Sequence, residues 1–209
     1  MLEFLLAVLY LLFGVPHAIS ILDLDGEMNL PTWFSSGQLF LLAALLFVIS
    51  RRESARHRPI VARAVGMLSL TFAFFSLDEV ATIHERINAN LEKYAAVPRF
   101  AGVGIWIFVY GALAVVILAI VAPGLWQYAR ANRSRALRFC MGAVIYLTGA
   151  VGLEILFYEH VFVGSLEVLV EECMEMGGVS VMIWACLLDL QTTPVEIHTA
   201  SLPSRLPSN

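Results

Sequence analysis

Long apolar stretches dominate this chain and constrain its fold more than any other feature. A helix that crosses a bilayer needs about 20 mostly apolar residues. Six stretches reach or approach that length: 2–22, 36–50, 60–83, 100–125, 139–160 and 167–190. The second is short and can include Trp33 and Phe34 at its outer edge. We therefore expect an all-α fold, a polytopic membrane bundle of about six transmembrane helices.

The composition excludes the main soluble classes. Hydrophobic residues make up 59% of the chain and charged residues 14%, whereas soluble domains have about 45–50% and about 25%. A chain of 209 residues cannot hide that excess in its core, because small domains leave much of their surface exposed. The net charge of -4 disfavours a nucleic-acid partner. The expected partners are the lipid bilayer and, as an open alternative, other membrane subunits.

The arginines predict how the chain is oriented. Nine of the thirteen basic residues lie within 51–63 and 130–138, and connections rich in Lys and Arg remain in the cytoplasm. We therefore expect a multi-pass protein of the inner (plasma) membrane with both termini cytoplasmic. Residues 1–190 form one expected transmembrane domain, and 191–209 a polar, disordered tail. The first stretch also resembles a signal peptide, but Glu3 stands where a positive charge is expected.

Three acidic residues lie inside otherwise apolar stretches. Asp78, Glu154 and Glu175 are each flanked by apolar helix-forming sequence, although an ionisable group there costs at least ~2.5 kcal/mol. At ~1.5 Å per residue, the three lie at one depth, in the outer third of the bilayer. We therefore expect them to converge within the bundle.

Helical phase extends this acidic cluster. At about 100° per residue, Asp78 and Glu85 share one face, with His84 at its margin. By the same count, Glu171 and Glu175 share a face of the last helix.

Several carboxylates at one level repel each other unless a cation or protons neutralise them. Few basic residues lie on that side, and a divalent metal with mixed nitrogen and oxygen ligands is the economical solution. We expect iron, manganese or zinc rather than copper. The predicted metal ligands are Asp78, His84, Glu85, Glu154, His160, Glu171 and Glu175. The Glu-x-x-His motifs of di-iron bundles are not present.

The functional prediction is a metal-dependent membrane enzyme, an oxidoreductase or hydrolase acting near the outer leaflet. One alternative is a proton- or cation-coupled carrier, in which protonation would relieve the repulsion. Another is a structural subunit of a membrane complex. A purely structural role is also open for Glu171, because acids suit the positive end of a helix dipole.

Two motifs carry a resemblance to a known group. These are Leu77-Asp78-Glu79 with His84-Glu85, and Glu171-Glu172 with Glu175-Met176. The chain resembles uncharacterised bacterial multi-pass membrane proteins with Leu-Asp-Glu…His-Glu and Glu-Glu-x-x-Glu-Met motifs. The resemblance covers roughly the third to sixth stretches. It implies an inner-membrane location and no particular activity.

Overall fold

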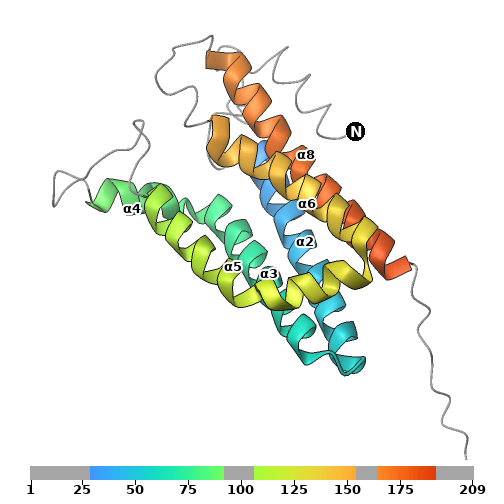
Figure 1. Ribbon diagram of the computed structural model, residues 1–209. Coiled ribbons are helices and arrows are strands. Elements are labelled where there is room, and N and C mark those ends of the chain that lie inside the picture. The colour runs from blue at the N-terminus through green and yellow to red at the C-terminus, as the bar shows by residue number, and fades with distance from the viewer. Residues whose placement is uncertain (1–28, 92–105, 154–163, 192–209) are drawn as a thin grey trace, which may run out of the picture.

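The described part of the chain is entirely helical, which confirms the all-α prediction. The computed structural model describes residues 29–91, 106–153 and 164–191 (Figure 1). These ranges contain six α-helices and one π-helix. In chain order they are α2 (Leu30–Ala55), α3 (Pro59–Ala81), α4 (Ile83–Leu91), α5 (Trp106–Ala131), α6 (Arg133–Leu147), η3 (Thr148–Leu153) and α8 (Gly164–Gln191).

Five stretches of helix in the described ranges are long and apolar enough to cross a membrane. They are Leu30–Ala55, Pro59–Ala81, Trp106–Ala131, Arg133–Leu153 and Val168–Gln191. These spans indicate a multi-pass membrane protein. The first expected span, 2–22, and the tail from 192 lie outside the described residues.

The second expected span is longer than the sequence predicted. The helix begins at Leu30, where the Asn29 side chain accepts a hydrogen bond of 3.0 Å from the backbone N–H of Thr32. Polar residues in the first turns lowered the apparent hydropathy, but they are buried against neighbouring helices. The Ser36 hydroxyl lies 3.0 Å from that of Ser76 in α3. The Gln38 amide donates to the Ser180 hydroxyl in α8 over 2.9 Å.

Helix α2 connects two helix pairs. It packs against both α3 and α8, while α5 lies along α3 and α6 lies along α8 (Figure 1). The shared core is formed by buried apolar side chains of these helices, among them Leu39, Leu42, Leu46, Val65, Phe72, Val179 and Met182. Serine hydroxyls reinforce this packing across helices, as when Ser69 donates to the Ala43 carbonyl over 2.7 Å.

Small residues set the closest helix approaches. A methyl group added at Gly178 in α8 would lie 2.5 Å from the Tyr146 backbone nitrogen in α6, whereas one at Gly177 would meet open space. In the same way, a methyl group at Gly124 of α5 would lie 2.5 Å from the Ala64 side chain of α3. Such contacts are typical of membrane helices, which associate by close packing.

The outer face of α5 is apolar and exposed. Val115, Leu118 and Ile120 each expose more than half of their surface. Contiguous apolar surface of this kind is unusual on a soluble monomer. At the arginine-rich end, the guanidinium groups of Arg130 and Arg138 lie over the rings of Trp126 and Trp184. Aromatic and basic residues are typically paired at the membrane–water interface.

Candidate functional site

Asp78 in the last turn of α3 binds His84 at two points. Its Oδ1 accepts a hydrogen bond of 3.0 Å from the His84 backbone N–H. Its Oδ2 lies 3.1 Å from Nδ1 of the His84 ring. The Asp78 carboxylate is buried, and the imidazole is half-buried. The pair therefore has a fixed geometry from which both the position and the ring orientation of His84 follow.

A break in the helix makes this contact possible. Helix α3 ends at Ala81, and Thr82 takes a left-handed conformation with φ 48° and ψ 45° before α4 begins at Ile83. A β-branched residue rarely adopts this conformation, and such strain costs on the order of 1–3 kcal/mol. Charge-assisted hydrogen bonds of the kind that Asp78 makes can offset that strain. Strained backbone of this kind clusters at functional sites.

Two aromatic residues of α5 complete this cluster. The Trp106 ring lies 5.4 Å from the His84 ring, and the Tyr110 ring stands edge-on to Trp106 at 5.7 Å. The buried Tyr110 hydroxyl is close enough to Asp78 to act on it electrostatically. It makes no hydrogen bond of standard geometry to the described residues. Asp78, His84, Trp106 and Tyr110 thus form one contiguous group, called the Asp78 cluster below.

Further carboxylates surround Tyr146 of α6. The carboxylates of Asp78, Glu79, Glu172 and Glu175 are all close enough to act electrostatically on its hydroxyl. The end of α3 and the first half of α8 therefore face the same tyrosine. Acids from two separate helices are thus brought into one neighbourhood.

The π-helix η3 packs against this part of α8. A methyl group added at Gly149 would lie 2.9 Å from the Glu171 carbonyl oxygen and 3.0 Å from Cγ of Glu175. Short π-helical segments within α-helices are frequent at functional sites. Glu154 directly follows η3 in the sequence.

The structure places the predicted site residues in different environments. Asp78 and His84 are in contact. The prediction that Asp78 and Glu85 share one helical face is wrong, because Thr82 interrupts the helix between them. Glu85 is exposed in the first turn of α4. Glu171 and Glu175 are half-buried on α8. Glu154 and His160 lie outside the described residues.

Among residues 29–91, 106–153 and 164–191, no group of three or more His, Cys, Asp or Glu side chains is arranged to hold a metal ion. The full seven-residue metal set includes Glu154 and His160, and it stays a prediction. Sequence reasoning did not find Trp106 or Tyr110, since aromatic residues near a helix end are equally typical of the membrane interface.

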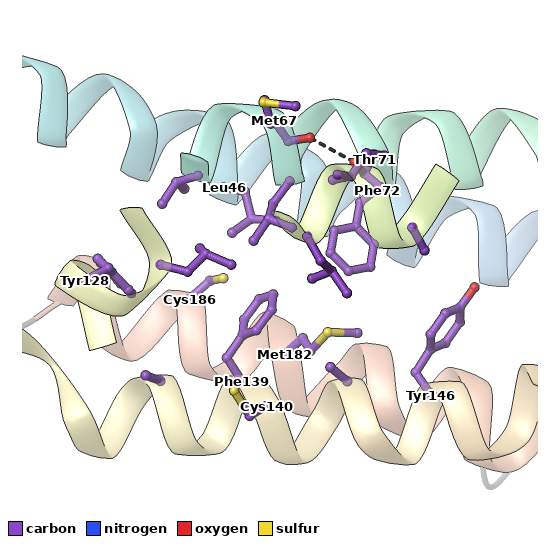
Figure 2. A pocket seen from close by; sticks show the side chains of 18 of the residues that line it. Leu46, Met67, Thr71, Phe72, Tyr128, Phe139, Cys140, Tyr146, Met182 and Cys186 are labelled. Carbon is purple, nitrogen blue, oxygen red and sulfur yellow. Dashed lines mark hydrogen bonds between the residues drawn. The ribbon is translucent and has the colours of Figure 1, made fainter. Parts of the chain in front are cut away.

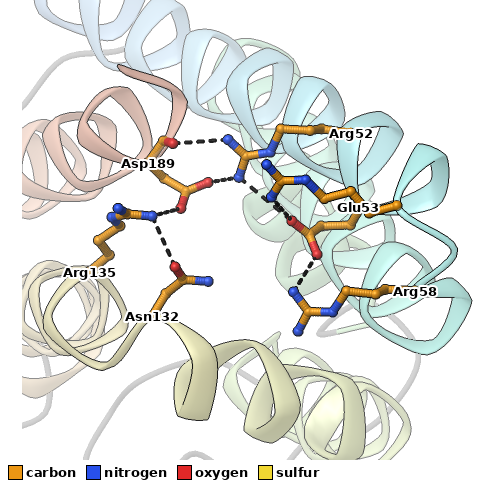
Figure 3. A network of polar contacts seen from close by, with 7 residues as sticks. Arg52, Glu53, Arg58, Asn132, Arg135 and Asp189 are labelled. Carbon is orange, nitrogen blue, oxygen red and sulfur yellow. Dashed lines mark hydrogen bonds and ion pairs between the residues drawn. The ribbon is translucent and has the colours of Figure 1, made fainter. Parts of the chain in front are cut away.

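A second polar cluster lies at the opposite end of the bundle. Asp189 of α8 accepts hydrogen bonds from the side chains of Arg52 and Arg135, the latter over 2.7 Å (Figure 3). Glu53 of α2 accepts from Arg58 over 2.7 Å and from Arg56 over 3.1 Å. The side chains of Glu53 and Asp189 are 0% and 1% exposed.

This arginine cluster, comprising Arg52, Glu53, Arg56, Arg58, Asn132, Arg135 and Asp189, joins α2, α6 and α8. This cluster is not among the predicted sites, because arginine-rich connections are typical of cytoplasmic loops. A usable signal was present in the sequence. Glu53 stands alone among five arginines, and Asp189 is the last acid of an apolar helix.

An apolar cavity of about 890 Å³ lies between the helix pairs (Figure 2). Side chains of α2, α3, α5, α6 and α8 line it, including Leu46, Phe72, Phe139 and Met182. Polar side chains occur almost only near its two ends. Tyr110 belongs to the Asp78 cluster, and Tyr146 lies near it. Arg135 belongs to the arginine cluster, and Tyr128 lies near it.

These features define a class, a multi-pass helical membrane protein with a polar cluster at each end of an apolar cavity. The chain belongs to the family described as a domain of unknown function (DUF8692), which matches residues 1–190. No curated protein and no solved structure matches the chain significantly. The family assignment agrees with the resemblance to membrane proteins without a known activity.

Proposed function

We propose that the chain is a membrane enzyme whose site is the Asp78 cluster, with a divalent metal ion bound through His84. The observation that supports this most is the double contact between Asp78 and His84. A histidine that ligates a metal almost always gives its other ring N–H to a carboxylate or carbonyl, which fixes the tautomer and ring orientation. In this proposal Asp78 positions His84, and Nε2 of His84 is the ligating atom.

The surrounding charge also supports a cation. Asp78, Glu79, Glu172 and Glu175 all act on the Tyr146 hydroxyl, so four carboxylates share one neighbourhood. A metal ion is a common means of stabilising such a group in a medium of low dielectric constant. Glu154, His160, Glu171 and Glu175 remain the proposed sources of further ligands. Mixed carboxylate and imidazole donors suit iron, manganese or zinc.

The Tyr110 hydroxyl gives the site a second chemical capability. It is buried beside Asp78, and a positioned phenol can donate a proton or a hydrogen bond to a bound substrate. A bound metal would act as a Lewis acid or activate a water molecule. These roles are compatible with hydrolase chemistry, and a redox-active metal would allow oxidoreductase chemistry.

Metal analysis of the purified full-length protein tests the proposal. After exposure to Fe²⁺, Mn²⁺ or Zn²⁺ and dialysis, we expect about one metal ion per chain in the wild type, and loss of that ion in His84→Gln. Asp78→Asn should weaken binding by about 10–100-fold, the usual effect of removing an orienting partner.

Glu85→Gln is the matched control, because Glu85 is exposed on the same helix as His84. It should retain the metal, and loss in this variant would place Glu85 among the ligands. A wild-type protein that binds none of the three metals would refute the metal site. Asp78 would then act only as the residue that holds α4 to α3.

A further inference from the structure

The cavity described above has opposite charges at its two ends. Arg135 lines one end, where residues 51–63 and 130–138 contain nine arginines and one acid, Glu53, and α8 adds Asp189. The other end adjoins Asp78 and Tyr146, where Glu79, Glu172 and Glu175 also lie. An anionic group would therefore be attracted to the arginine end and repelled from the other.

The part of α6 that lines the cavity is about as long as one leaflet of a bilayer is deep. From Arg135 to Tyr146, α6 advances 11 residues, or about 16 Å at 1.5 Å per residue. Half of a hydrocarbon core of about 30 Å is about 15 Å. A lipid with its headgroup at the arginine end would thus extend its chain to Tyr146.

The cavity is too narrow for another helix. The rings of Phe72 in α3 and Phe139 in α6 meet edge to face across it, with centroids 6.4 Å apart (Figure 2). An α-helix with side chains is about 10–12 Å wide, so a helix from a second copy could not pass between these rings. A flexible hydrocarbon chain is thinner than a helix and can follow the remaining space.

We infer that the cavity binds one acyl chain of an anionic phospholipid, with the phosphate group at Arg135. Arg135 uses a single terminal nitrogen, Nη1, for both Asn132 and Asp189. A guanidinium has five N–H donors in a planar fork that matches phosphate oxygens. This site goes beyond the proposed metal chemistry and does not depend on it.

Native mass spectrometry of the full-length protein tests this assignment. The protein is exchanged into nanodiscs of equal parts phosphatidylglycerol and phosphatidylcholine with identical acyl chains, then released. We expect one phosphatidylglycerol per chain to be retained, at least fivefold over phosphatidylcholine. Equal retention of the two lipids would overturn the inference. Release of the protein as a dimer without bound lipid would overturn it as well.

A pair of α5 variants locates the lipid. Ala114 lines the cavity, whereas Ala119 is exposed on the same helix and does not line it. Ala114→Phe should reduce the retained phosphatidylglycerol at least fivefold, and Ala119→Phe should leave it unchanged. Equal retention by the two variants would place the lipid outside the cavity and refute the inference.

The double variant Arg135→Gln/Asp189→Asn tests the headgroup contact. It removes both partners of the Arg135–Asp189 ion pair, and Arg52, which also bonds to Asp189, keeps its contact with Glu53. The double variant should retain phosphatidylglycerol and phosphatidylcholine equally. A preference that survives in a folded double variant would show that Arg135 does not select the headgroup and would overturn its placement.

Discussion

Asp189 provides the sharpest test of what holds the arginine-rich end together. Its side chain is 1% exposed and accepts hydrogen bonds from Arg52 and Arg135. Asp189→Asn keeps the shape of the residue but removes the negative charge. Two arginines then face each other across a neutral amide. We therefore expect a large loss of stability from a change of very few atoms.

The size of the stability loss in Asp189→Asn depends on how exposed the two arginines are. Removing one member of a buried ion pair costs about 3–5 kcal/mol, because the remaining charge is buried without compensation. Here the arginine side chains are 18% and 24% exposed and recover part of their hydration. We take the lower end, about 3 kcal/mol. For a chain of this size that corresponds to a fall in Tm of about 6–12 °C.

The assay is thermal unfolding in detergent, followed by tryptophan fluorescence. Arg56→Gln is the matched control, since Arg56 bonds to Glu53 over 3.1 Å but is 37% exposed. An exposed ion pair contributes about 0.2–1 kcal/mol, so the Tm of this variant should fall by at most about 4 °C.

A double variant separates the pair from the individual residues. Arg135→Gln combined with Asp189→Asn should be less destabilising than the sum of the two changes, because the same pair is removed only once. The reasoning would be refuted if Asp189→Asn melted within 2 °C of Arg56→Gln, or if the two losses were strictly additive.

Three further predictions concern the backbone and the topology. Gly178→Ala should cost about 1–3 kcal/mol, because the methyl group would meet the Tyr146 backbone, whereas Gly177→Ala should be nearly neutral in thermal unfolding. Thr82→Gly should raise the free energy of unfolding by about 0.5–1 kcal/mol, since glycine adopts the left-handed conformation without strain; no change in Tm would argue against strain at this position. A reporter fused after Ser54 should give a cytoplasmic signal, and an external signal would reverse the proposed orientation.

The class of fold could be predicted because membrane insertion requires long apolar stretches that are visible in the sequence. The start of α2 could not be predicted in the same way. Ser36 and Gln38 look unfavourable in a membrane when considered one by one, but each bonds to another helix. A hydropathy value describes the polarity of a residue and not the partner it bonds to. The span predicted from hydropathy is therefore shorter than α2.

The Asp78 cluster was predicted only in part. Shared depth and apolar surroundings identified Asp78, and the spacing to His84 suggested a pair. The contact itself depends on the left-handed Thr82, and no local sequence rule places a β-branched residue in that conformation. Helical phase was extrapolated through this break, which is why Glu85 was assigned to the wrong face.

The two ends of the bundle differ in their balance of acidic and basic residues within the described ranges. At the arginine end, both buried acids are matched by arginines at hydrogen-bond distance, so packing and ion pairing account for their burial. At the other end, the described helices contain seven acids and one arginine, Arg86. At the arginine end, about 21 Å away along α8 between Glu175 and Asp189, arginines are more numerous than acids. Because carboxylates in a membrane helix cost free energy, this local excess of acids is consistent with the cation proposed above. That asymmetry is the reason to look for function at Asp78 rather than at Asp189.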